Sequence, residues 1–270
     1  MQRAIAVLDS GVGGLTVVKE IMRQLPGEPI LYFGDTARAP YGPRPAHEVI
    51  RFTCEIVDYL LRFRPKMIVV ACNTATALAL DEIRKRSPYP VVGVIAPGAR
   101  AAVERTQSNV IGVIGTEGTI RSGAYETALR RLSPRIRVVQ LACPEFVPLV
   151  EAGKFDSPEA YGVVARSLAP LKGCGLDTLI LGCTHYPFLA STISEYMGPG
   201  VALISSAEAA GREVGAVLRG SRLLAPADGP LVHRFFCSGD PRKFQEIALQ
   251  WLGKSFYRTP TVWQVPAVGW

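Results

Sequence analysis

Two cysteines follow short apolar segments of the same kind. Cys72 follows residues 67–71, and Cys183 follows residues 178–182. Four or five apolar or small residues bounded by polar ones favour a buried parallel strand, and we expect the Asn and Thr residues beyond each cysteine to cap a following helix. Both thiols are therefore predicted at the carboxyl ends of strands, which is where open α/β sheets bind ligands.

Two thiols on opposite sides of one ligand could move a proton on and off a carbon atom. Inverting a stereocentre by proton transfer needs a base on one face of the carbon and an acid on the other. A free cysteine has a pKa of about 8.5, and a helix N-terminus or a positive group lowers it, so both forms are accessible near neutrality. This chemistry needs no aldimine lysine, and the sequence has no persuasive pyridoxal-phosphate signature. We expect no cofactor.

The surroundings of the two cysteines repeat as well. Residues 5–11 resemble residues 111–118, and a further apolar segment follows each cysteine, at 91–95 and at 201–205. We interpret this as an internal duplication of one α/β unit, although any two such units share part of this pattern. The predicted fold is α/β, with two pseudo-symmetric domains of mostly parallel sheets flanked by helices. The active site is expected in the cleft between them.

The order of the predicted elements sets the domain boundaries. We expect the chain to cross into the second domain at Pro97-Gly98, and a helix from about Ala207 to return it to the first. The predicted first domain comprises residues 1–97 and 207–270 and carries Cys72. Residues 98–206 form the predicted second domain, which carries Cys183. Within these domains we expect a loop at 115–119 and a strand at 231–237.

Composition narrows the class of protein. The net charge is +7 and the pI about 9.2, but the basic residues are scattered, so nucleic acid is not an expected partner. No uninterrupted apolar run of about eighteen residues is present, and no signal peptide precedes the first strand, so we expect a soluble cytoplasmic protein with no membrane association. The six cysteines have no framework spacing and are expected to be thiols.

The first loop, at residues 9–14, combines an acid with glycines. It lacks the last glycine of a dinucleotide-binding motif, and no Gly-Lys-Ser/Thr follows, so we reject nucleotide binding. We expect the loop to aim Asp9 and backbone N–H groups at a small anionic ligand near a helix N-terminus.

Asp9 and His185 have both functional and structural interpretations. Asp9 could assist Cys72 or hold a substrate ammonium, and His185 could assist Cys183, two residues away. The structural alternatives are a loop-capping carboxylate and a helix-capping imidazole. Cys72, Cys183 and His185 also have the ligand types of an open zinc centre. We favour free thiols and expect no metal.

Several segments resemble the cofactor-independent aspartate/glutamate racemase family, and within it the glutamate racemases. They are residues 9–17, 32–42, 72–75, 115–120 and 182–187. The resemblance implies interconversion of L- and D-glutamate by two cysteines, with Cys72 serving D-glutamate and Cys183 L-glutamate. It also implies supply of D-glutamate for peptidoglycan, and hence a role in cell shape. Dimers are common in the family, so a homodimer is compatible with it.

The resemblance also implies site residues. Beside the cysteines it gives catalytic roles to Asp9, His185 and Glu151. Its substrate contacts are Asp9, Ser10, Pro40, Tyr41, Gly42, Asn73, Thr74, Thr116, Thr119, Thr184 and His185. Glu145 departs from the family pattern, because it stands where an apolar residue is expected. The alternatives are a racemase of a related acidic amino acid such as aspartate, and a non-catalytic two-lobed amino-acid binding protein.

Overall fold

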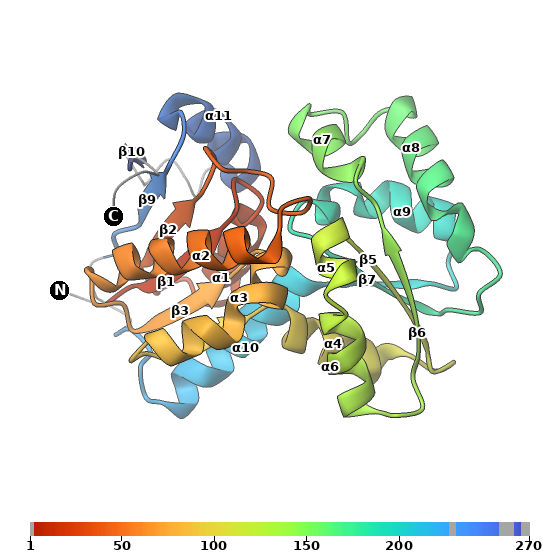
Figure 1. Ribbon diagram of the computed structural model, residues 1–270, viewed down its shortest axis with the longest axis horizontal. Helices are drawn as coiled ribbons and strands as arrows, with labels where there is room; N and C mark the ends of the chain where they lie inside the picture. Colours follow the sequence, from red (N-terminus) through yellow and green to blue (C-terminus); the bar gives the residue numbers. More distant parts are fainter. Residues whose placement is uncertain (1–2, 227–230, 254–261, 266–270) are drawn as a thin grey trace.

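Two parallel sheets form the framework of the molecule. The computed structural model describes residues 3–226, 231–253 and 262–265. One sheet has the strand order β10-β9-β2-β1-β3-β4 and the other has the order β6-β5-β7-β8. All pairings among these strands are parallel. Figure 1 shows the sheets side by side, and we call the parts built on them lobe one and lobe two.

Lobe one is assembled from both ends of the described chain. Its strands are β1 (Ile5–Asp9), β2 (Ile30–Gly34), β3 (Met67–Val70), β4 (Val91–Gly93), β9 (Arg234–Cys237) and β10 (Val262–Gln264). Its helices are α1 (Leu15–Gln24), α2 (Ala46–Leu61), α3 (Asn73–Arg86), α10 (Ser206–Gly220) and α11 (Pro241–Leu252).

Lobe two is built from the middle of the chain. Its strands are β5 (Val110–Gly115), β6 (Arg137–Ala142), β7 (Thr178–Gly182) and β8 (Ala202–Ser205). Its α-helices are α4 (Ile95–Arg105), α5 (Glu117–Arg121), α6 (Ala124–Leu132), α7 (Phe146–Glu151), α8 (Pro158–Leu168) and α9 (Ala190–Met197). Two 3₁₀ helices, η1 (Ala169–Leu171) and η2 (Tyr186–Leu189), complete it.

The two sheets share one strand order. β2-β1-β3-β4 in lobe one corresponds to β6-β5-β7-β8 in lobe two. Every residue of β1, β3 and β7 is buried, as expected for parallel strands covered by helices on both faces. The predicted α/β fold with two similar parallel sheets is confirmed.

Helices α4 and α10 connect the lobes. Pro97 and Gly98, at which the chain was expected to cross between the domains, lie within α4, where a proline in the first turn removes no intrahelical hydrogen bond. α10 begins at Ser206 and packs against both α1 and α4. The division into residues 1–97 with 207–270 and residues 98–206 stays our proposal for the domain boundaries.

Three element boundaries differ from the prediction. The predicted loop at 115–119 contains the start of α5, whose N-cap is Thr116. The apolar segment at 91–95 is a strand only as far as Gly93, and Ile95 begins α4. The predicted strand at 231–237 begins only at Arg234. Short apolar segments do not distinguish a strand from the first turn of a buried helix.

The described residues include no helix that is both long and apolar enough to span a membrane.

Candidate active site

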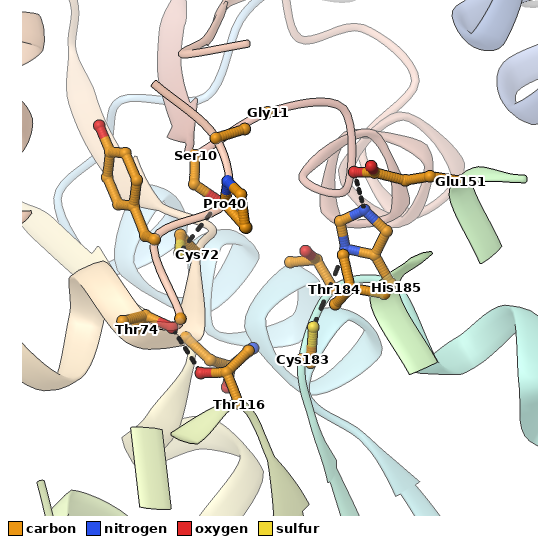
Figure 2. A pocket seen from close by; sticks show the side chains of 15 residues that line it. Ser10, Gly11, Pro40, Cys72, Thr74, Thr116, Glu151, Cys183, Thr184 and His185 are labelled. Carbon is orange, nitrogen blue, oxygen red and sulfur yellow. Dashed lines mark hydrogen bonds and ion pairs between the residues drawn. The ribbon is translucent and has the colours of Figure 1, made fainter. Parts of the chain in front are cut away.

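A cavity lies between the carboxyl ends of the two sheets and is lined from both lobes (Figure 2). Its walls come from the segments that follow β1, β2 and β3 in lobe one and β5, β6 and β7 in lobe two. The lining residues are Ser10, Gly11, Ala39, Pro40, Tyr41, Gly42, Cys72, Asn73, Thr74, Thr116, Val147, Glu151, Cys183, Thr184 and His185. The cavity therefore occupies the sheet edge at which the sequence placed a ligand.

Most of the predicted site residues meet at this cavity, and both predicted thiols are among them. Two do not line it, because Asp9 and Thr119 are fully buried behind its wall. Three lining residues, Gly11, Ala39 and Val147, were not predicted. Their backbone and apolar surfaces carry no chemical signal, so a search for polar side chains passes over them.

Cys72 enters from lobe one as the N-cap of α3. Its Sγ accepts a hydrogen bond from the backbone N–H of Ala75 (3.4 Å) and lies 3.6 Å from Oγ of Ser10. Burial, and secondly the charge of Asp9, raise the pKa of the Cys72 thiol to about 12, although Ala75 and Ser10 oppose this shift. The cap predicted for the Asn and Thr residues is thus the cysteine itself, and its surroundings favour the protonated thiol.

Cys183 enters from lobe two in a different local structure. No α-helix begins beside it, so the capped helix predicted here is wrong; the chain instead forms the short 3₁₀ helix η2. Nδ1 of His185 lies 3.9 Å from Sγ of Cys183 (Figure 2). An imidazole thus occupies the place beside this thiol that the helix N-terminus takes at Cys72.

His185 joins Cys183 to a carboxylate. Its Nε2 lies 3.1 Å from Oε1 of Glu151. Burial disfavours the charged imidazole, but the hydrogen bonds to Cys183 and Glu151 outweigh that effect and raise the pKa of His185 to about 10. His185 is therefore a cation at neutral pH. It makes no side-chain capping bond to η2, so the helix-capping interpretation is wrong.

Asp9 lies behind Cys72, and only one of its two carboxylate oxygens accepts a hydrogen bond from the described residues. Oδ2 accepts the backbone N–H of Gly11 (3.0 Å), as the loop-capping interpretation expects. Oδ1 is buried and has no hydrogen-bond partner among the described residues. Burial raises the pKa of Asp9, while the charge of His185 and nearby backbone N–H groups act in the opposite direction.

The two lobes touch directly at the cavity. A Cβ atom at Gly13 would lie 2.2 Å from Oγ1 of Thr184, so only glycine allows this approach. On the other side, the backbone N–H of Gly118 donates to the carbonyl of Gly42 (2.8 Å). Gly13 of the first loop therefore fits against the opposite lobe.

A threonine cluster bridges the lobes beside this contact. Oγ1 of Thr74 lies 2.8 Å from Oγ1 of Thr116 and 3.2 Å from Oγ1 of Thr119. Thr74 and Thr116 line the cavity, whereas Thr119 is fully buried. The structure thus places the Thr119 hydroxyl within hydrogen-bond distance of both cavity-lining threonines.

The loop that carries Pro40, Tyr41 and Gly42 is held from behind by Asp35. This fully buried carboxylate accepts hydrogen bonds from the Tyr41 hydroxyl, from Ser238 (2.6 Å) and from Nε of Arg38 (2.7 Å). The hydroxyl of Tyr41 is therefore occupied, although the residue lines the cavity.

Glu145 lies outside this arrangement. It immediately precedes α7, its side chain is exposed, and it does not line the cavity.

Among the described residues, no group of three or more His, Cys, Asp or Glu side chains is arranged to hold a metal ion.

Comparison with known proteins gives one consistent answer. Residues 5–214 match the model of the Asp/Glu/Hydantoin racemase family. The chain is 53% identical over 254 residues to a glutamate racemase of Bacillus cereus, covering 94% of each chain. It also matches the crystal structure of the glutamate racemase isoform RacE1 from Bacillus anthracis, with a TM-score of 0.93, 47% identity and 97% of each chain covered. The glutamate racemase of Francisella tularensis in complex with D-glutamate gives a TM-score of 0.92 at 32% identity, over 100% of this chain and 99% of that one.

Proposed function

We propose that this chain, which belongs to the Asp/Glu/Hydantoin racemase family, interconverts L-glutamate and D-glutamate. Membership makes it an amino-acid racemase. Its substrate is inferred from glutamate racemases at 53% identity and from one related structure that holds D-glutamate. The observation that carries the proposal is that Cys72 and Cys183 reach one cavity from opposite lobes.

In the proposed reaction the two thiols act on opposite faces of the α-carbon. The thiolate of Cys183 removes the α-proton of L-glutamate, and the resulting carbanion takes a proton from the thiol of Cys72 to give D-glutamate. Cys183 then holds the proton and Cys72 is the thiolate, so D-glutamate reacts by the same steps in reverse. No cofactor enters this scheme.

The electrostatics of the site support this assignment. The raised pKa of Cys72, about 12, keeps its proton available for donation. The cationic imidazole of His185 faces Cys183, and a neighbouring positive charge favours a thiolate. Glu151 supports that cation from its other nitrogen. We therefore assign Cys183 as the base for L-glutamate and Cys72 as the base for D-glutamate.

Polar groups around the thiols suit the rest of an acidic amino acid. Hydroxyls and amide N–H groups on Ser10, Asn73, Thr74, Thr116 and Thr184 offer donors for two carboxylates. The free Oδ1 of Asp9 lies behind Cys72 and offers a counter-charge for the substrate ammonium. We further propose that the D-glutamate serves peptidoglycan synthesis in the cytoplasm; whether the protein acts as a homodimer stays a prediction.

Turnover of the purified protein tests this proposal. Addition of L-glutamate is expected to give a loss of optical rotation that ends at a racemic mixture, and D-glutamate should give the mirror-image change. L-aspartate, measured in parallel at the same concentration, is expected to react more slowly. Faster racemisation of aspartate would reassign the substrate. Binding of glutamate without any racemisation would support the non-catalytic alternative.

A further inference from the structure

Tyr125 reaches across the lobe boundary to a residue of the cavity wall. It lies on α6 in lobe two and is fully buried, and it does not line the cavity. Its hydroxyl donates a hydrogen bond of 2.7 Å to Oδ1 of Asn73, which follows Cys72 in lobe one. Burial raises the pKa of Tyr125 well above its usual value, so the phenol remains a donor throughout the working pH range.

The ring of the same tyrosine packs against the other cysteine's strand. A Cβ atom at Gly182, the residue before Cys183, would lie 3.0 Å from Cε2 of Tyr125. One side chain therefore contacts the residue after Cys72 and the residue before Cys183. No part of the proposed proton transfer uses this contact.

Ser206 fixes the other end of the Asn73 amide. Oγ of Ser206 donates to the carbonyl of Leu181 (3.2 Å) and lies 3.5 Å from Nδ2 of Asn73. A hydroxyl has one proton, so with that proton committed to Leu181, Ser206 can only accept from the amide. The amide group facing Ser206 must be the NH₂, and the group facing Tyr125 must be the carbonyl.

This arrangement leaves one N–H group of Asn73 available. The NH₂ group has two protons, and Ser206 takes one of them. Nδ2 has no other hydrogen-bond partner among the described residues, and Asn73 lines the cavity. In the reversed orientation, the carbonyl oxygen would face Ser206 without a donor, and an N–H would face the phenol oxygen.

We propose that Tyr125 is a positioning residue of the racemase: it holds the Asn73 amide in one orientation, so that an N–H of Asn73 meets a carboxylate of the bound substrate. This inference rests on the proposed function. Tyr125 acts through Asn73 and does not touch the substrate. A rotated amide would instead present its carbonyl oxygen to the carboxylate and repel it.

The test replaces Tyr125 by phenylalanine and measures KM and kcat separately. A contact made equally in the ground state and the transition state affects KM, so we expect KM to rise about threefold to tenfold while kcat changes little. A double-mutant cycle identifies the route. In an Asn73→Ala background, Tyr125→Phe should leave KM unchanged, because the amide that it orients is gone.

Tyr186→Phe is the matched control. Tyr186 is also fully buried, and its hydroxyl donates to the carbonyl of Cys143 (2.8 Å), away from Asn73. Its effect on KM should multiply with that of Asn73→Ala. An unchanged KM in Tyr125→Phe, or the same KM factor with and without the Asn73 side chain, would overturn the proposal.

A second variant covers the case in which Tyr125→Phe does not fold. Ser206→Ala removes the acceptor for the Asn73 NH₂ group and leaves Tyr125 in place, and it should also raise KM only when Asn73 is present. The wild type separates the two hypotheses: a wild type that does not racemise glutamate refutes the proposed function and this inference with it. A wild type that racemises, with KM effects independent of Asn73, refutes this inference alone.

Discussion

Nδ1 of His185 lies 3.9 Å from Sγ of Cys183, whereas the corresponding neighbour of Cys72 is the backbone N–H of Ala75. The two thiols thus occupy equivalent places in two similar sheets but unequal electrostatic surroundings. A cation faces Cys183, and burial beside Asp9 keeps the proton on Cys72. In the proposed reaction, one thiol must accept a proton and the other must donate one.

His185 should set the alkaline limit of activity. Its raised pKa of about 10 means that the imidazole is charged below that pH and neutral above it. The positive charge beside Cys183 is therefore present at neutral pH and lost as the pH rises through about 10. We expect kcat/KM to fall above about pH 10. Measuring kcat/KM as a function of pH with both enantiomers checks this.

The two directions provide an internal check on this profile. The equilibrium constant of a racemisation is one at every pH, so kcat/KM for L- and D-glutamate must share one profile. In His185→Asn, the fall near pH 10 should disappear and activity at neutral pH should drop by about 10²-fold or more. An unchanged alkaline limb in this variant would contradict the role of His185.

Glu151 should support the charge of His185. Because its carboxylate accepts from Nε2 at 3.1 Å, Glu151→Gln is expected to lower the pKa of His185. The shift should be modest, since 45% of the Glu151 side chain is exposed to solvent. Titration of the imidazole by NMR measures it directly.

Glu145→Gln is the matched control for that titration, because Glu145 is exposed and does not line the cavity. This substitution should leave the pKa of His185 the same as in the wild type. Equal effects of the two substitutions would indicate a general charge effect and remove Glu151 from the site.

Asp35 should hold the loop of Pro40 to Gly42 in place. Asp35→Asn removes the buried charge that pairs with Arg38, so we expect the free energy of unfolding to fall by about 3 kcal/mol. KM should rise as well, because the loop forms one wall of the cavity. Denaturant unfolding and steady-state kinetics check the two effects.

Asp81→Asn provides the comparison for Asp35, since Asp81 pairs with Arg84 at 3.5 Å on the surface, where its side chain is 90% exposed. Its unfolding free energy should stay within about 0.5 kcal/mol of the wild type. A stable Asp35→Asn variant with normal KM would show that the loop does not depend on this carboxylate.

The sequence predicted the strands better than the turns that follow them. The apolar segments before Cys72 and Cys183 carry a strong local signal, so both strands and both sheet-edge thiols were located. The structures after the cysteines depend on tertiary contacts, and the sequence did not show that Cys72 caps α3 or that Cys183 is followed by η2.

The sequence also did not predict residues that line the cavity with apolar side chains or that act through another residue. Val147 lines the cavity with an apolar side chain, which carries no chemical signal in the sequence, and Tyr125 meets Asn73 from another lobe. Such contacts between segments far apart in the chain leave no pattern of spacing. Asp9 was predicted from the first loop and Thr119 from the family resemblance, and neither kind of inference can tell a side chain in a cavity wall from one behind it.

Free thiols, and no metal ion, should account for activity. Treatment with a strong chelator followed by desalting is expected to leave kcat/KM unchanged, whereas alkylation of the thiols should abolish it. Prior saturation with glutamate should protect Cys72 and Cys183 from the alkylating agent. Activity lost to the chelator and restored by zinc would contradict the two-thiol account.

Single-cysteine variants should separate the two half-reactions. Serine has a much less acidic group than cysteine, so Cys72→Ser and Cys183→Ser should each lose racemisation by more than about 10²-fold. The remaining thiol can still exchange the α-proton on its own face. We expect Cys72→Ser to exchange L-glutamate and Cys183→Ser to exchange D-glutamate.

The fate of the α-hydrogen in deuterated water tests the central claim most directly. One thiol removes the substrate proton and the other delivers a solvent-derived deuteron to the far face, so at early conversion L-glutamate should give deuterated D-glutamate while the remaining L-glutamate stays protonated. D-glutamate should behave in the mirror-image way. Mass spectrometry of the separated enantiomers measures both. Label that enters substrate and product equally from the start would show one shared base and contradict the paired action of Cys72 and Cys183.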